Sequence, residues 1–393
     1  MNKAVIVEAV RTPIGRFNGG LKSLIAPKIG AEAIKGLLSR VDLDPALIDE
    51  VMMGSVVQAG LGQNPARQAA IFAGIPTSVS AVTINKVCGS GLKTVMLAAQ
   101  AIKAGDAHCI VAGGMENMSK IPYAMFDARD GMRLGHRQVT DLMVHDGLWD
   151  VYNDFHMGMT AELVVDKYEI SREAQDEFAA NSHIKAIAAM NSGKFDKEIV
   201  PVEIPQRKGD PVVISKDEGP RDGTTAEGLG KLRAAFKRDG GSVTAGNAST
   251  INDGAAAVMV CSEEFAKEHG LTIRCYIDAY ATGALDPEWV MMAPVGAVNN
   301  LLEKTGKSLG DYGIFELNEA FAAQSLGVVG ELGLDSEKVN VHGGAVALGH
   351  PIGASGTRCL VTLLHAMEDR DENNGIVALC LGGGDAVAMA ISR

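Results

Sequence analysis

The sequence predicts an α/β protein made of two similar halves with an inserted segment between them. Short runs of Ala, Val, Ile and Leu are bounded by glycine and alternate with helical patterns, which is typical of strands buried on both faces of a sheet. Glycine is abundant, with 46 residues in 393, whereas aromatic residues make up only 5%. With 47% hydrophobic residues the chain can form a large core, and its length indicates two or three domains or two halves with an insertion.

An internal repeat indicates the two halves. Three short segments recur after about 265 residues, a period that indicates duplication of a large unit. The matching pairs are Asp49–Gly54 with Asp311–Glu316, Gly89–Gly91 with Ala354–Gly356, and Ile110–Ala112 with Ile376–Ala378. We therefore expect one half at 1–119 with 251–271 and the other at 272–393, related by a pseudo-twofold axis.

The segment 120–250 is predicted to be an inserted loop domain. It is richer in charges and turns, as in Phe126–Gly131 and Arg207–Pro211. One helix is indicated from Ser171 as N-cap to about Asn191, with Gly193 placed to end it. Irregular segments of this length inside a compact protein are usually lids or binding loops.

Composition excludes several classes of function. The net charge of −12, with no long basic run, argues against nucleic acid or an anionic membrane as the main partner. Six cysteines without a CxxC pair indicate reduced thiols rather than a disulfide framework or a zinc site. The N-terminus reads as a first strand rather than a signal peptide, and the uncharged stretch 68–85 is broken by Pro76. We expect a soluble, cytoplasmic protein.

Two segments could carry a nucleophile and its base. Cys88 precedes a predicted helix that begins near Gly89, where unpaired N–H groups and the helix dipole favour a thiolate. A buried structural cysteine is the alternative. His350 lies in a glycine-rich bend before another helix, close to the repeat-equivalent of Cys88, so a Cys–His pair is geometrically reasonable. A structural histidine is again the alternative, and His342 is the less attractive candidate because it precedes the bend.

Two further segments follow predicted strands. Cys380 precedes the glycines 382–384, whose N–H groups could face a ligand oxygen, although a tight turn would explain them equally well. Asn318 and Glu319 end another strand and could orient a water or an amide. A phosphate loop is not indicated, because Gly306-Lys307-Ser308 lacks the leading glycine of that motif, and no metal-ligand spacing is evident.

Taken together, these segments resemble the thiolase family, and within it the acetyl-coenzyme A (CoA) acetyltransferase type. The resemblance spans nearly the whole chain in the order of the family, and its motifs are specific only in combination. They are Glu8–Gly15, Asn85–Gly91, Gly113–Ser119, Thr244–Ser249, Asn318–Ala322, Gly343–Gly356 and Cys380–Gly384. The resemblance implies a thiolase-like fold with two five-stranded, helix-covered halves and a loop domain.

The resemblance also implies a role for each site residue. Cys88 would take the acyl group from a first thioester, with His350 as its base, and Cys380 would move a proton at the α-carbon of the second acetyl group. Asn318, through a water, and His350 would hold one thioester oxygen, while N–H groups of Cys88 and Gly382 would hold the other. The substrate-binding positions implied are Leu148, His156, Met157, Arg221, Ser249, Ala320 and Phe321.

The implied reaction is the reversible condensation of two acetyl-CoA molecules to acetoacetyl-CoA and CoA, within fatty acid metabolism. No metal or cofactor is expected, since the CoA thioesters are substrates. Phe155–Glu162 resembles short-chain members, whereas Val290 stands where a pocket methionine is expected, and Lys120–Ala124 departs from the loop that joins two dimers. A homodimer or homotetramer is expected.

Three alternatives remain. One is a 3-ketoacyl-CoA thiolase of broader chain length, from fatty-acid degradation. Another is a catalytically silent scaffold that binds acyl-CoA. A decarboxylating or hydroxymethylglutaryl-forming enzyme of the same superfamily is disfavoured by the Cys88, His350 and Cys380 set, because those enzymes usually carry a second His or a Glu.

Overall fold

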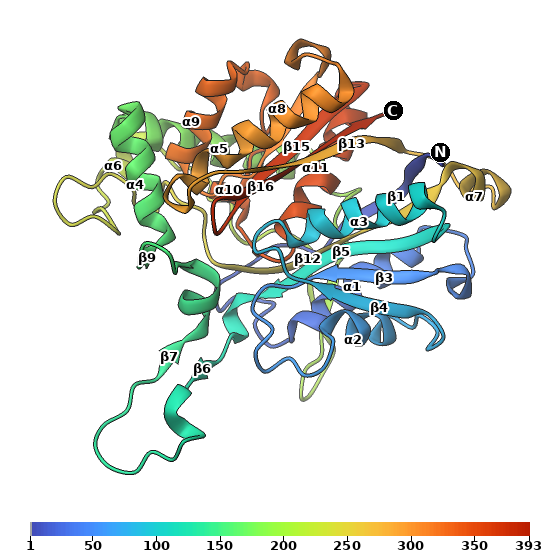
Figure 1. Ribbon diagram of the computed structural model, residues 1–393, viewed down its shortest axis with the longest axis horizontal. Helices are drawn as coiled ribbons and strands as arrows, with labels where there is room; N and C mark the ends of the chain where they lie inside the picture. Colours follow the sequence, from blue (N-terminus) through green and yellow to red (C-terminus); the bar gives the residue numbers. More distant parts are fainter. Residues whose placement is uncertain (1) are drawn as a thin grey trace.

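The computed structural model describes residues 2–393 and contains a central ten-stranded sheet. Each half of the protein contributes one side of this sheet (Figure 1). In sheet order, the N-terminal side consists of β4 (Ser80–Ile84), β3 (Glu50–Gly54), β5 (Cys109–Asn117), β12 (Asn252–Ser262) and β1 (Ala4–Arg11), with the short β2 (Gly15–Arg16) paired to β12. The C-terminal side consists of β13 (Cys275–Ala284), β16 (Asp385–Ser392), β15 (Asn374–Leu381) and β14 (Ile314–Leu317).

The two sides of the sheet repeat the same strand pattern. Strand β3 is parallel to β4 and β5, and β5, β12 and β1 follow in antiparallel order. Likewise β14 is parallel to β15, and β15, β16 and β13 follow in antiparallel order. In the second half, Val339 takes the position that β4 has in the first half, because it forms a parallel bridge with Phe315 of β14. The predicted fold class, two similar halves with an insertion, is therefore confirmed, and the halves join where β1 pairs with β13.

Helices cover the sheet in layers. Helices α3 (Ser90–Ala104) and α11 (Ser355–Arg370) lie side by side between the two halves, where one large apolar cluster contains residues of both (Figure 1). The outer face of the N-terminal side is covered by α1 (Ala26–Leu38) and α2 (Pro65–Phe72), and that of the C-terminal side by α8 (Ala293–Thr305) and α9 (Ala322–Leu332). The short α7 (Glu263–Glu268) follows β12, and α10 (Ala345–Leu348) precedes α11.

The first turns of α3 and α11 touch, and glycine is required at both. A Cβ atom at Gly91 would lie 2.7 Å from Thr357 Oγ1 and 2.9 Å from the Thr357 backbone nitrogen. A Cβ at Gly356 would lie 2.5 Å from the backbone nitrogen of Leu92. Because side chains of any size would separate the helices, this contact brings the Cys88 loop and the His350 loop to the same place.

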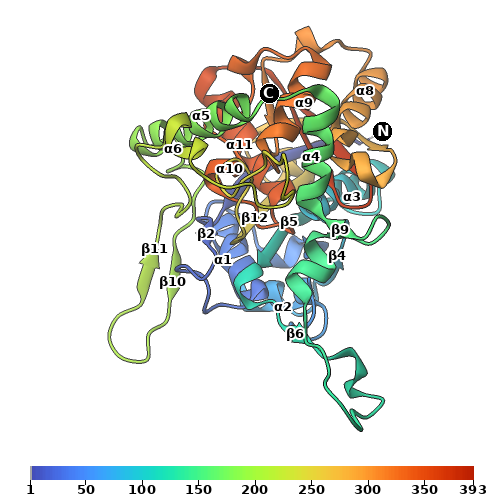
Figure 2. The same cartoon turned by 90° about the vertical axis from the view of Figure 1, so that its left-hand side faces the viewer.

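The inserted segment adds three α-helices, a π-helix and three hairpins, two of which project. The predicted helix is present as α5 (Arg172–Asn191), where the Ser171 side chain accepts the N–H of Ala174 and Gly193 follows with φ +70°. Sequence reasoning missed α4 (Met157–Tyr168), which begins where the His156 ring accepts the N–H of Gly158. The remaining elements are α6 (Ala226–Gly230), a π-helix (Met143–Leu148), and strands β6 (Tyr123–Ala124), β7 (Thr140–Asp141), β8 (Trp149–Asp150), β9 (Phe155–His156), β10 (Val202–Ile204) and β11 (Val212–Ile214). The β6–β7 and β10–β11 hairpins project from the body (Figure 2).

No helix within residues 2–393 is both long enough and apolar enough to span a membrane.

Candidate active site

A mostly apolar cavity of about 690 Å³ lies between the two halves and the inserted segment. Eleven of the twelve site residues expected from the sequence line it. Four of them lie at or next to the ends of helices and strands of the two halves: Cys88, His350, Cys380 and Gly382. The other seven belong to the substrate-binding set: Leu148, His156, Met157, Arg221, Ser249, Ala320 and Phe321.

Cys88 lies one residue before Gly89, the N-cap of α3. The preceding residue, Val87, has φ +45°, a left-handed conformation that a β-branched side chain adopts only under strain of about 1–3 kcal/mol. Side chains hold this turn: Asn85 Oδ1 accepts the N–H of Val87 at 2.9 Å, and Ser90 Oγ donates to the Val87 carbonyl at 2.6 Å. The local sequence thus holds Cys88 in a fixed turn on the cavity wall.

The thiol of Cys88 is neutral in the resting protein. Burial raises its pKa to about 12, and the backbone N–H groups of Gly382 and of Cys88 itself oppose this only in part. Burial, with a smaller contribution from the charge of Arg358, lowers the pKa of His350 to about 3. The expectation that the helix start favours the thiolate is therefore wrong, because burial in a mostly apolar cavity outweighs the N–H groups and the neighbouring His350 imidazole is uncharged.

Cys380 is the last residue but one of β15, and the turn that follows this strand supplies an N–H group. Gly383 and Gly384 have φ of +90° and +84°, so this turn requires glycine. Burial is the main cause that raises the pKa of Cys380, and the neighbouring Cys88 raises it further. A Cβ at Gly89 would lie 2.5 Å from Leu381 Cδ2, so the Cys88 turn packs directly against the end of β15. The two thiols are therefore close enough that ionisation of one disfavours ionisation of the other.

Asn318 does not lie on the cavity wall; it sits behind the His350 ring. Its Nδ2 is 3.5 Å from His350 Nδ1, and its Oδ1 is 3.5 Å from Arg358 Nη2. Glu319 has a structural place, because it accepts hydrogen bonds from Ser182, Asn340 and the N–H of Val346.

His342 lies away from the four core residues of the cavity. Its Nε2 is 3.4 Å from Asp369, and its ring packs edge-on against Phe195. The sequence argument that ranked it below His350 agrees with this placement.

The inserted segment forms the outer wall of the cavity with aromatic side chains. The His156 ring stacks on Phe236 with centroids 4.8 Å apart, and Phe236 meets Phe321 edge-on at 6.1 Å. Both Val290 and Met291 line the cavity. Sequence reasoning missed Phe236, which lies in no recognisable motif. It expected a pocket methionine at the position of Val290 and gave no role to the neighbouring Met291.

Glu116 is a further residue that sequence reasoning missed. It is fully buried beside the cavity, and its carboxylate accepts the N–H groups of Val56, Val57 and Gly353. It thereby fastens the loop that follows His350 to the N-terminal half. Burial raises its pKa to about 7. It lies within the Gly113–Ser119 motif, but sequence reasoning gave it no role of its own.

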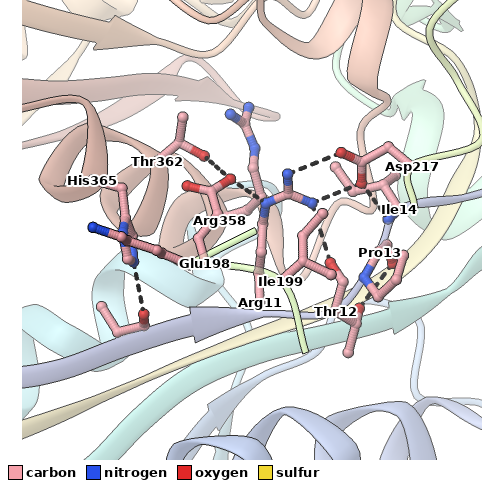
Figure 3. Close-up of polar contacts among 12 residues, drawn as sticks. Arg11, Thr12, Pro13, Ile14, Glu198, Ile199, Asp217, Arg358, Thr362 and His365 are labelled. Carbon is pink, nitrogen blue, oxygen red and sulfur yellow. Dashed lines mark hydrogen bonds and ion pairs between the residues drawn. The ribbon is translucent and has the colours of Figure 1, made fainter. Parts of the chain in front are cut away.

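A buried ionic cluster ties the inserted segment to both halves. Figure 3 shows Arg11 of β1 between two carboxylates: its Nε is 2.6 Å from Glu198, and its Nη1 and Nη2 are 2.7 and 2.9 Å from Asp217. Asp217 also accepts the N–H of Ile14, and Thr362 of α11 lies 3.3 Å from Glu198. Because each buried charge has partners, removal of one would leave the others uncompensated.

Among residues 2–393, no group of three or more His, Cys, Asp or Glu side chains is arranged to hold a metal ion. The chemistry that this arrangement can perform with its own groups is acyl transfer. It offers two neutral thiols, the neutral imidazole of His350 and backbone N–H donors in a mostly apolar cavity. Such donors stabilise the negative charge that develops on a thioester oxygen.

Comparison with known proteins places this geometry in a family. A model of the thiolase N-terminal domain matches residues 4–264, and a model of the thiolase C-terminal domain matches residues 271–393. The acetyl-CoA acetyltransferases of Pseudomonas aeruginosa and Cupriavidus necator are each 55% identical to the chain over the full length of both. The crystal structure of the Bacillus anthracis acetyl-CoA acetyltransferase superposes with a TM-score of 0.97 at 45% identity, covering 100% of this chain and 99% of that one. The chain belongs to the thiolase family.

Proposed function

We propose that this protein is an acetyl-CoA C-acetyltransferase, which joins two acetyl-CoA molecules into acetoacetyl-CoA and CoA and also catalyses the reverse thiolysis. The observation that carries the proposal is the meeting of Cys88, His350 and Cys380, from three separate parts of the chain, in one cavity. The full-length relatives named acetyl-CoA acetyltransferase support it.

The first half-reaction forms an acetyl-cysteine. Cys88 attacks the carbonyl carbon of acetyl-CoA while its proton passes to His350, which is neutral and so can accept it. The bond to the CoA sulfur breaks, and CoA leaves as a thiol with the proton of Cys380. The imidazolium now present lowers the pKa of the Cys380 thiol, because it stabilises a nearby thiolate.

The second half-reaction forms the carbon–carbon bond. The Cys380 thiolate removes a proton from the methyl group of a second acetyl-CoA, and the carbanion attacks the acetyl group on Cys88. The bond to Cys88 breaks, and its sulfur takes the proton back from His350. Each side chain returns to its starting state, and the products are acetoacetyl-CoA and CoA.

Backbone donors stabilise the charge that develops in both steps. The N–H groups of Gly382 and Cys88 lie within hydrogen-bonding reach of the Cys88 sulfur, which supports their role at the oxygen of the acetyl group attached there. Each such donor contributes about 3–4 kcal/mol to the transition state. Asn318 and His350 would hold the oxygen of the second thioester, with Asn318 acting through a water because it lies behind the ring.

Acetyl-CoA, acetoacetyl-CoA and CoA would enter along the wall formed by the inserted segment. The pantetheine arm of CoA would pack against Leu148, Ser249 and Phe321, which line the cavity. The length of the acyl group would be limited by His156 and Met157. Arg221 is exposed and lines the cavity, which supports a contact with the adenine end of CoA. We infer a preference for short acyl chains in fatty acid metabolism.

We further propose a homodimer or homotetramer in the cytoplasm that needs no metal or organic cofactor. The projecting β6–β7 hairpin exposes large apolar side chains, with Leu134 89% and Tyr123 65% exposed, which supports self-association. All six cysteines are free, and the chemistry requires two of them reduced, which supports a reducing compartment. The thiols and the imidazole supply nucleophile and bases by themselves.

The test is a thiolysis assay with acetoacetyl-CoA and CoA, in which loss of the enolate absorbance reports cleavage. We expect rapid loss with the native protein, and we expect Cys88→Ala to show neither this loss nor an acetylated peptide by mass spectrometry. Binding of acetyl-CoA without turnover in the native protein would instead identify a silent scaffold. A series of 3-oxoacyl substrates of increasing length checks the chain-length preference.

A further inference from the structure

We propose that Ser355 is a positioning residue that holds His350 in the tautomer with its proton on Nδ1, leaving Nε2 free to accept the proton of Cys88. The inference rests on the proposed function, because it takes His350 as the base of the acyl-transfer step. It assigns to the first residue of α11 a part in the chemistry that the thiol and imidazole positions alone do not reveal.

The hydrogen bonds around Ser355 decide which atom carries the proton. His350 Nδ1 lies 2.6 Å from Ser355 Oγ, and both residues are buried. Ser355 Oγ lies 2.9 Å from the carbonyl oxygen of Pro351, which can only accept. A hydroxyl has one proton, so Ser355 donates it to Pro351 and accepts from His350. The opposite arrangement would leave two acceptor oxygens facing each other at 2.9 Å with no proton between them.

The other half of the protein supplies an internal comparison. Ser90 opens α3 as Ser355 opens α11, 265 residues later. Ser90 Oγ donates to the Val87 carbonyl at 2.6 Å and accepts the backbone N–H of Lys86 at 2.8 Å. In the first half, therefore, the backbone fills the acceptor site of the serine.

In the second half a proline takes the place of the residue whose backbone N–H binds the serine. The residue 265 positions after Lys86 is Pro351, which has no N–H to donate. The acceptor site of Ser355 is therefore free for a side chain, and the residue that takes it, His350, occupies the place of Asn85 in the first half. The change from Asn-Lys to His-Pro thus replaces the backbone donor to the serine with the His350 ring, which the serine can then orient.

The tautomer matters because the His350 ring is neutral. Its pKa is lowered to about 3, so at neutral pH the ring has one proton and two possible places for it. With Nδ1 turned to Ser355, Nε2 is the nitrogen left for the cavity that the ring lines. A proton on Nε2 instead would block uptake of the thiol proton.

Removal of the hydroxyl should reverse the tautomer. In Ser355→Ala the nearest remaining partner of Nδ1 is Asn318 Nδ2 at 3.5 Å, which is a donor. It would favour a lone pair on Nδ1 and hence a proton on Nε2. Thr357→Val is the matched control: it removes a hydroxyl from the same turn of α11, and within residues 2–393 that hydroxyl has no hydrogen-bond partner.

The experiment is solid-state NMR of protein labelled with nitrogen-15 in histidine, with the His350 signal assigned by its loss in His350→Asn. We expect an Nδ1 proton in the native protein and in Thr357→Val, and an Nε2 proton in Ser355→Ala. The rate of Cys88 acetylation should fall about a hundredfold or more in Ser355→Ala, as expected for loss of general-base catalysis, with KM changed less than about twofold.

An Nε2 proton in the native protein would overturn the inference, as would a native acetylation rate in Ser355→Ala. If Ser355→Ala does not fold, the tautomer of the native protein decides the question by itself. Failure of the native protein to turn over acetoacetyl-CoA would contradict the proposed function, whereas the tautomer measured in the same sample would still test the Ser355 contact.

Discussion

The contact between α3 and α11 gives the sharpest test of how the fold builds the site. In Gly91→Ala the added Cβ would lie 2.9 Å from the backbone nitrogen of Thr357, while ordinary contact begins at 3.4 Å. The two helices must therefore separate by about 0.5 Å, because backbone atoms cannot move aside as a flexible side chain can. The Cys88 and His350 loops precede these helix starts, so the separation passes directly to the reacting groups.

The magnitude follows from two general relations. A misplacement of about 1 Å costs on the order of a hundredfold in rate, so a shift of about 0.5 Å should lower kcat on the order of tenfold. Overpacking of a buried contact costs up to about 3 kcal/mol, and the better helix propensity of alanine offsets about 1 kcal/mol, so the free energy of unfolding should fall by about 2 kcal/mol.

The assay combines thiolysis kinetics with urea denaturation, and Gly296→Ala is the matched control. Gly296 lies within α8, and a Cβ there would have its nearest neighbour 4.0 Å away, the Cα of Gly283. We expect native kcat and a gain of about 0.5–1 kcal/mol in this control. Native kcat and stability in Gly91→Ala would refute the reasoning that close helix packing sets the distance between the reacting groups.

Three further predictions address the chemistry and the stability. Cys380→Ser should still become acetylated at Cys88, yet condense poorly, because a serine hydroxyl is a much weaker acid and its alkoxide is not available as a base; equal slowing of both half-reactions would contradict this division of roles. His350→Asn should flatten the pH dependence of stability. Because the pKa of His350 is lowered, below about pH 6.5 this histidine binds a proton in the unfolded chain but not in the folded protein. The free energy of unfolding of the native protein should therefore fall between pH 7 and pH 5 by about 2 kcal/mol more than that of the variant, as measured by urea titrations. Arg11→Ala should lower the free energy of unfolding by about 3–5 kcal/mol, because two buried carboxylates lose their partner. Lys231→Ala, at an exposed pair, should change it by less than about 0.5 kcal/mol, and similar small losses in both variants would show that the buried cluster is not held by charge.

Local patterns in the sequence were sufficient for much of the fold. The buried strands, the helix after Ser171 and the duplication could be predicted because hydrophobic period, capping residues and recurring motifs are properties of neighbouring residues. The N-cap of α4 escaped prediction because a histidine ring takes that role, which sequence preferences for Ser, Thr, Asp and Asn do not anticipate.

The site divides in the same way. The sequence by itself determined which residue types were available, since Cys88, His350 and Cys380 each stand beside glycines at the end of an element. Only the tertiary structure decided that Asn318 lies behind the ring, that Phe236 and Met291 complete the wall, and that both thiols are neutral. The physical reason is that protonation and side-chain contacts depend on which groups from distant segments come together and exclude water. The spacing of residues along the sequence does not specify these groups.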